Sequence, residues 1–308
     1  IERRGKCRPG DRTLLDAMDA AAKKALEASK AWSKAEMIAP KQFREEISPY
    51  FNANPKKYIS ALVSEDCWQA TPGKVVDLVR NLGIAAGGTV MEDCRVLEAC
   101  REGKYTSVLV QTHDKKYVEY RTEHFVNALG SGAGKLCDSM GIDAGLYPVR
   151  HQAFITRRLP MLGKHGTNLD MLIDRQDYKG FSAVYGQQIA YTGQIIGCAS
   201  PKLDAMRIDK NLKVNTKAFL EIVSEMFSEW IPDLAGVGIQ AVWAGYYTEP
   251  RYIVDPELGL FVGMRGHGFM LSQYIARMYV DKLLGRPVPE YFEKLKLNGP
   301  GLSEKAFK

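Results

Sequence analysis

A glycine-rich turn between an apolar run and a helix is the strongest chemical signal in this chain. Residues 259–263 form the run, and Gly266 and Gly268 follow it before a helix that is predicted to end near Leu284. The first turn of a helix has free N–H groups and a partial positive charge, and glycine lets a ligand approach them closely. Such a turn can stabilise an oxyanion or a phosphate, and a plain tight turn in an α/β layer has the same pattern.

Two weaker signals could also serve a ligand. The run from Phe125 to Ala128 enters glycines at Gly130 and Gly132, which brings its backbone close to a neighbouring group. Glu2 lies near the start of the chain, and an acidic residue at the end of a strand of a dinucleotide fold binds ribose hydroxyls. Taken alone, the first pattern is common in α/β turns, and Glu2 is a charged residue near a terminus.

Several kinds of chemistry lack the residues that they require. The six cysteines form no CxxC pair and show no zinc-finger spacing, so we expect no metal site and interpret them as thiols in a reducing compartment. The sequence contains no HExxH, no EF-hand loop and no serine nucleophile elbow for hydrolysis. The net charge of +6 is small for 308 residues, and no basic cluster with interleaved aromatics predicts nucleic-acid binding.

The hydropathy pattern argues against insertion into a membrane. No apolar run approaches the roughly 20 residues that a membrane-spanning helix requires. Residues 1–5 carry charges that no apolar segment follows, so they are not typical of a signal peptide. We therefore expect a soluble, cytoplasmic protein.

The elements that would position the glycine turns alternate between helical and strand patterns. Thr71-Pro72 begins a helix that Gly83 ends. Its predicted buried face comprises Val75, Val76, Leu78, Val79 and Leu82. Further helices are predicted from Asp11 to about Ala35 and from Thr216 to Trp230, and strands at 108–112, 117–120, 125–128, 153–156, 194–197 and 259–263. Because the composition does not break along the chain, any second domain is inserted rather than appended.

Five stretches of the chain, taken in order, carry a family pattern. Phe125 to Leu136 is similar to V-N-A-x-G-x-W-x-x-x-L, and Pro148 to Gln152 is similar to P-V-R-G-Q. Gly263 to Phe269 closely matches G-x-x-G-H-G-F, and Trp243 to Thr248 and Tyr291 to Lys305 also fit. Together they resemble the FAD-dependent amino-acid oxidase family, which includes glycine oxidase, sarcosine oxidase and dye-linked proline dehydrogenase.

The resemblance implies a mixed α/β fold in two domains. A glutathione-reductase-like FAD-binding domain would carry an inserted substrate-binding domain built on an antiparallel sheet. The FAD domain is assigned to residues 1–40, 70–147 and 236–308, and the substrate domain to residues 41–69 and 148–235. The first Rossmann strand and its GxGxxG turn are absent from the given chain, since they would need about 30 residues before Glu2.

The resemblance also assigns residues to the site. The residues expected along FAD are Glu2, Arg3, Val96, Asn127, Ala128, Gly130, Gly263, Gly266, His267, Gly268, Phe269 and Met270. Tyr247 would face the substrate, and Arg265 would hold its carboxylate through a bidentate pair, although a solvated turn cation fits Arg265 equally well. His151, in place of the glycine of P-V-R-G-Q, is a further substrate-binding candidate. Gly245 stands where sarcosine oxidases carry the cysteine that links to flavin, so we expect FAD to be non-covalent.

The implied reaction is oxidation of the C–N bond of an amino acid or secondary amine, resembling sarcosine, glycine or proline, by hydride transfer to flavin. Met270 replaces a lysine of the oxidases, which favours a dehydrogenase that passes electrons to a partner subunit within an oligomer. Oxidation of a 2-hydroxy acid or glycerol phosphate on the same fold stays open, because a fold does not determine a substrate. A non-catalytic structural or assembly subunit derived from a flavoprotein stays open as well.

Overall fold

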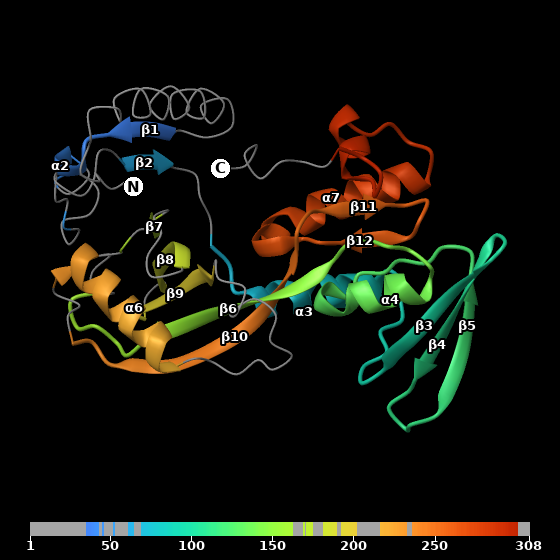
Figure 1. Cartoon of the computed structure of the whole chain (residues 1–308), viewed down its shortest axis with the longest axis horizontal. Coiled ribbons are helices and arrows are strands. Elements are labelled where there is room, and N and C mark those ends of the chain that lie inside the picture. The colour runs from blue at the N-terminus through green and yellow to red at the C-terminus, as the bar shows by residue number, and fades with distance from the viewer. Residues whose placement is uncertain are drawn as a thin grey trace. The chain divides into compact units, whose positions relative to one another are not determined.

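The computed structural model divides into two compact units, of which unit 1 comprises residues 1–67 and 150–245 and unit 2 comprises residues 68–149 and 246–308 (Figure 1). The structure describes residues 35–42, 45, 52, 61–64, 69–162, 169, 171–174, 181–189, 192–201, 216–232 and 236–300. The helix predicted from Asp11 lies outside the described residues, except that Ala35 begins a strand. The predicted domain boundaries stay a prediction.

Unit 1 is built on a five-stranded sheet in the order β10-β6-β9-β8-β7, in which β6, β9, β8 and β7 pair antiparallel. These strands are β6 (Tyr147–Thr156), β7 (Leu172–Asp174), β8 (Phe181–Ile189), β9 (Gln194–Pro201) and β10 (Ile239–Glu249). A second pair, β1 (Ala35–Ile38) with β2 (Ala61–Ser64), is also antiparallel, and the short α2 (Pro40–Gln42) follows β1. The two strands predicted within residues 148–198 are confirmed inside β6 and β9.

Helix α6 (Thr216–Trp230) supplies the core of unit 1, as its period predicted. Its apolar face buries Phe219, Ile222, Val223 and Phe227 against Phe154 and Phe181 of the sheet. Phe154 and Phe227 meet edge to face with ring centroids 5.2 Å apart. Burying an aromatic or aliphatic side chain of this size contributes about 1.5–3 kcal/mol, so this cluster holds α6 on the sheet.

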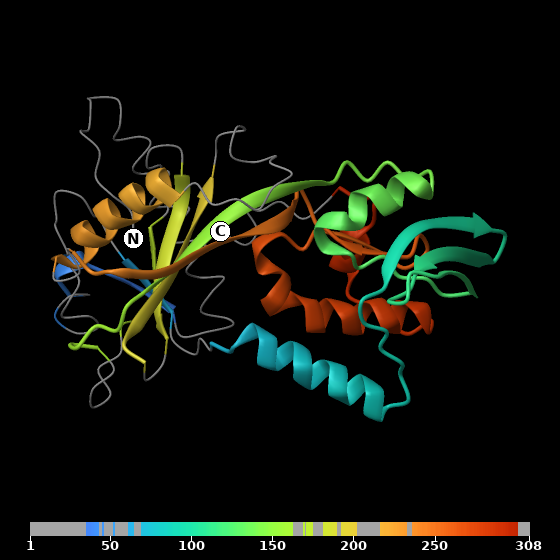
Figure 2. The ribbon, with the colours of Figure 1, turned by 90° about the horizontal axis from the view of Figure 1, so that it is seen from below.

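Unit 2 contains a three-stranded antiparallel meander and several helices (Figure 2). The meander confirms the predicted hairpin. Its strands are β3 (Arg95–Glu102), β4 (Tyr105–Gln111) and β5 (Tyr117–Thr122). The remaining elements are α3 (Pro72–Ala85), η2 (Gly130–Gly132), α4 (Ala133–Ser139), β11 (Ile253–Asp255), β12 (Leu260–Val262), η4 (Arg265–His267), α7 (Gly268–Leu283) and η5 (Glu290–Leu295).

The core of unit 2 forms around β11, β12 and the helices that flank them. Helix α7 buries Ile275, Met278 and Tyr279 against the β11 strand and Phe292 of η5. Leu260 and Val262 of β12 are 0% and 1% exposed. The predicted strand at 259–263 and the helix ending near Leu284 are therefore confirmed, and their packing fixes where the glycine turn between them begins.

Two predictions for unit 2 are wrong. The apolar face of α3 is not buried, because Val76, Leu78, Val79 and Leu82 are 50–62% exposed and no described element packs extensively on this helix. Helical periodicity shows that a face is apolar, but it does not supply the partner that covers the face. The run from 125 to 128 is not a continuous buried strand, since Asn127 alone forms a bridge and Val126 is 44% exposed.

None of the helices in the described ranges combines the length and the apolar character that crossing a membrane requires.

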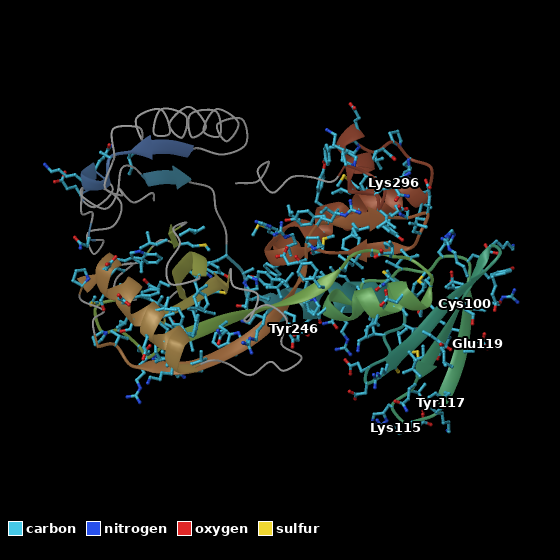
Figure 3. The ribbon with its side chains drawn as sticks, in the orientation of Figure 1. Cys100, Lys115, Tyr117, Glu119, Tyr246 and Lys296 are labelled. Atoms are coloured by element: carbon cyan, nitrogen blue, oxygen red, sulfur yellow. The ribbon has the colours of Figure 1, made fainter. Side chains whose placement is uncertain are left out.

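Cys100 is expected to be alkylated well before Cys198. Cys100 lies exposed on β3 (Figure 3), whereas Cys198 is buried in β9 and burial raises the pKa of its thiol to about 11. The thiolate is the nucleophile, so iodoacetamide at about pH 8 distinguishes an exposed cysteine from one whose buried thiol stays protonated. Peptide mapping by mass spectrometry measures the rates. Both cysteines should react alike in denaturant, and equal rates in the folded protein would contradict the assigned burial.

Candidate cofactor site

Two chain segments of unit 2 run in parallel into glycine turns. The N–H of Asn127 donates to the Gly259 carbonyl at 2.8 Å, and the N–H of Phe261 donates to the Asn127 carbonyl at 3.0 Å. Because the two segments are parallel at this bridge, the turn at 130–132 and the turn at 263–268 both leave from the carboxyl ends of the segments. Open α/β sheets bind their ligands beyond this edge.

The side chain of Asn127 shapes the first turn. It is 1% exposed, its Nδ2 donates to the Ala133 carbonyl at 3.0 Å, and its Oδ1 accepts from the Leu129 N–H at 3.2 Å. Gly130 then takes a φ of +54°. Because its amide is committed to the protein backbone, Asn127 positions the turn.

The second turn is pressed against the segment that joins β10 to β11. Gly263 has a φ of +72°, and a Cβ added there would lie 1.9 Å from the Arg251 carbonyl oxygen. A Cβ on Gly266 would lie 2.7 Å from Cε2 of the Tyr247 ring. Glycine is therefore required at 263 by backbone contact and favoured at 266 by the tyrosine, which the turn holds beside it.

Polar pairs with the end of β10 and with the segment after it fix the turn further. Arg265 Nε and Glu249 Oε2 form an ion pair at 2.5 Å, with side chains only 16% and 14% exposed. The Tyr252 hydroxyl and His267 Nδ1 are hydrogen-bonded at 2.6 Å. A charge pair so far removed from water interacts strongly, and losing one partner would leave the other in an unfavourable position. The pairs therefore hold the backbone of 265–267 in one conformation.

Helix α7 begins directly after this turn and keeps its first N–H groups uncapped. His267 at the N-cap makes no side-chain hydrogen bond to the helix, and Gly268 is the first helical residue. Phe269 and Met270 are 45% and 67% exposed beside these donors. Backbone donors, a helix dipole and exposed apolar side chains together suit a flat, partly apolar ligand with an electron-rich edge.

The structure brings most of the predicted site residues together. Tyr247, Arg265 and residues 263–270 gather at one turn of unit 2, and Asn127, Ala128 and Gly130 lie on the neighbouring parallel segment. Val96 lies in β3, opposite Val110 and next to a register shift.

The other three predicted residues do not belong to the described part of unit 2. His151 is buried in unit 1, and Glu2 and Arg3 lie outside the described residues. Sequence reasoning missed Glu249 and Tyr252, whose pairing depends on how the chain folds back. The only available signal was their position shortly before the glycine turn, with Glu249 at the end of β10 and Tyr252 directly before β11.

A family model and solved structures match this chain. The model described as DAO, FAD dependent oxidoreductase, matches residues 1–282. L-proline dehydrogenase from P. horikoshii has a TM-score of 0.71 and 24% identity, over 87% of this chain and 69% of that one. Glycine oxidase from Geobacillus kaustophilus has a TM-score of 0.68 and 16% identity, over 88% of this chain and 68% of that one.

A third solved structure and the curated proteins complete the comparison. Iminodiacetate oxidase from Chelativorans sp. BNC1 has a TM-score of 0.64 and 14% identity, over 95% of this chain and 74% of that one. At these identities the matches show a shared fold. No curated protein matches the chain.

Proposed function

Because this chain belongs to the FAD-dependent oxidoreductase family, we propose that it oxidises the C–N bond of an amino acid or a secondary amine. The observation that carries the proposal is the pair of glycine turns at the carboxyl ends of two parallel segments, one of which opens an uncapped helix. The chain is an enzyme of the FAD-dependent class, and the finer substrate assignment is the proposal.

The described residues fit FAD at its flavin end. The backbone of Gly266 to Met270 would lie along the ring, where the first N–H groups of α7 meet the electron-rich edge. Gly130 and Val96 would lie further along the cofactor, and Glu2 is proposed for the ribose. When bound, FAD would supply a hydride acceptor for the carbon beside the amine nitrogen, and the resulting imine would hydrolyse in water.

Tyr247 and Arg265 are proposed to orient the substrate. The Tyr247 ring packs against Gly266, so the glycine turn and the tyrosine hydroxyl are positioned together. Arg265 would present its guanidinium to a carboxylate while Glu249 holds it from the other side. An amine that binds in its neutral form needs no strong general base. The binding of FAD is proposed to be non-covalent, and transfer of electrons to a partner subunit is part of the proposal.

A substrate panel tests this function. The protein in its full native length is assayed with a dye acceptor against glycine, sarcosine and proline, and against 2-hydroxy acids and glycerol phosphate. We expect dye reduction with an amine, accompanied by ammonia or methylamine from the open-chain substrates. Turnover of the hydroxy compounds alone would replace the proposal with the alternative oxidation. If flavin-loaded protein turns over none of these compounds, the result favours the alternative that the chain is a non-catalytic structural subunit.

A further inference from the structure

Unit 2 contains a cavity of about 210 Å³ away from the glycine turns. Its lining comes from the β3–β4 hairpin, the residues that follow β5, the turn at 256–259 and the last turns of α7. Phe125 and Gly259 line it and precede the parallel bridge at Asn127 and Leu260. The cavity therefore lies at the amino ends of the parallel segments, whereas the proposed cofactor turns leave from their carboxyl ends.

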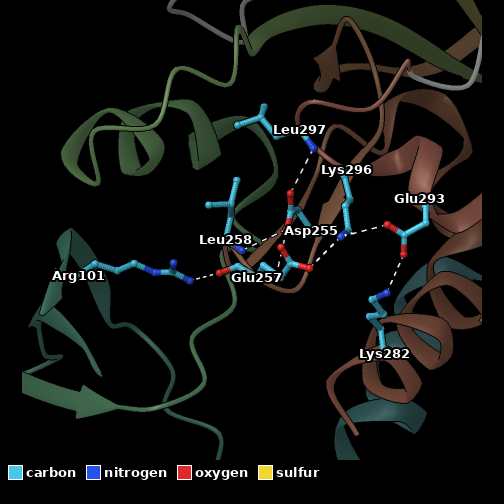
Figure 4. A network of polar contacts seen from close by, with 8 residues as sticks. All are labelled: Arg101, Asp255, Glu257, Leu258, Lys282, Glu293, Lys296 and Leu297. Atoms are coloured by element: carbon cyan, nitrogen blue, oxygen red, sulfur yellow. Dashed lines mark hydrogen bonds and ion pairs between the residues drawn. The ribbon is translucent and has the colours of Figure 1, made fainter. Parts of the chain in front are cut away.

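Basic side chains dominate the rim of this cavity. Arg101 donates to the Glu257 carbonyl, which holds the guanidinium in place (Figure 4). The Glu257 carboxylate pairs with Lys296 at 2.8 Å. Lys104 pairs with Glu123 at 2.8 Å. The lining thus carries two cations, Arg101 and Lys104, against one carboxylate, Glu123, and is positive by one charge before His124 is counted.

Tyr279 is also a lining residue of the cavity. Tyr279 is 4% exposed, and its hydroxyl has no hydrogen-bond partner within the part of the chain that the structure describes. Burial raises the pKa of Tyr279 to about 12, with the charge of Asp255 adding to the shift, so the hydroxyl is a neutral donor at physiological pH. Folded proteins seldom leave a buried hydroxyl unpaired, because the lost hydrogen bond costs free energy.

We propose that this cavity binds a phosphate anion, either free or as the phosphate group of a small metabolite. The Tyr279 hydroxyl donates to one oxygen, and Arg101 and Lys104 supply charge from the opposite hairpin. Pockets for whole cofactors have volumes of about 300–1,000 Å³, so a space of about 210 Å³ fits a phosphate with a short organic group and excludes a dinucleotide. Donors on separate elements suit a tetrahedral oxyanion.

Calorimetric titration of the full-length protein tests the site without any turnover. Inorganic phosphate and phosphoethanolamine are titrated at constant ionic strength, because screening alone alters exposed charges. We expect binding of at least one probe, with Tyr279→Phe weakening it about tenfold through the lost hydrogen bond. Arg101→Gln should weaken it by about tenfold or more, since bonds to charged groups are stronger. Preference for the organic phosphate identifies a metabolite, and preference for the inorganic ion identifies free phosphate.

Matched variants on α7 provide the controls. Tyr274→Phe removes a hydroxyl that accepts from Tyr291 at 2.9 Å outside the cavity, and Arg277→Gln removes an exposed arginine that pairs with Asp281. Both should bind phosphate as the wild type does. If the protein binds acetate but neither phosphate probe, the choice of phosphate as the ligand is overturned.

Thermal melts give a second readout that also guards against misfolding. Without phosphate, Tyr279→Phe should be at least as stable as the wild type, since it deletes an unpaired buried hydroxyl. With phosphate the order should reverse, because a ligand stabilises the form that binds it more tightly. Equal phosphate affinity in the wild type and Tyr279→Phe, or no binding of either probe, would overturn the site and would leave the proposed oxidation unaffected.

Discussion

Replacing Gly263 with alanine is expected to destabilise unit 2 by about 2–6 kcal/mol. The residue has a φ of +72°, and its new Cβ would lie 1.9 Å from the Arg251 carbonyl oxygen. The left-handed backbone costs about 1–3 kcal/mol, and forcing a methyl group into occupied space costs about 1–3 kcal/mol more. The obstructing atom belongs to the backbone, so it cannot move aside by rotating a side chain. Denaturant unfolding followed by circular dichroism measures the loss.

Gly285→Ala is the matched control for this substitution. Gly285 has a φ of +67°, but a Cβ there meets nothing within 4 Å. It therefore carries the backbone strain of about 1–3 kcal/mol without the collision. We expect Gly263→Ala to be clearly the less stable of the two. Equal losses would show that the turn at 263 is not pressed against the Arg251 carbonyl.

Arg265→Met is expected to lower kcat/KM for carboxylate substrates by about 10–100-fold. A hydrogen bond to a charged group contributes about 1.5–3 kcal/mol, and the proposed pair with the substrate carboxylate would be lost. An amine substrate without a carboxylate should lose much less. Steady-state kinetics with both substrate types measures the difference.

The ion pair with Glu249 requires a control of its own. Removing Arg265 leaves the Glu249 carboxylate, which is 14% exposed, without its cation. The double variant Glu249→Gln/Arg265→Met removes both charges, so that no unpaired buried charge is left. If Arg265 only holds the turn, the double variant should recover activity toward every substrate. If the double variant stays less active only with carboxylate substrates, the result supports direct binding of the substrate carboxylate by Arg265.

The sequence predicted the self-contained elements well. Helix α6 carries its own apolar period, and the β4–β5 hairpin carries its own turn, so both could be placed from local residues. The face of α3 has an equally clear period, yet it lies exposed because burial depends on a partner that periodicity does not encode. The same reason explains residues 125–128, where pairing is limited to Asn127.

The candidate site was partly predictable for a similar reason. The glycines at 263, 266 and 268 indicate that other atoms approach the backbone closely there, and this can be predicted from the local sequence. The pair of Glu249 and Arg265 joins residues on either side of a chain reversal, and their types alone give no sign of contact. The cofactor contact of Asn127 stays a prediction, and nothing in the sequence indicated that its amide bonds to Leu129 and Ala133 and orders the turn.

The absorption spectrum of the full-length protein after gel filtration tests the central claim most directly. If the amides of α7 and its glycine turn hold FAD without a covalent link, the protein elutes with the visible bands of oxidised flavin. Heat denaturation then releases the flavin into the supernatant, and an amine substrate bleaches the bands under anaerobic conditions. A folded, colourless protein that takes up no FAD on titration would contradict the account.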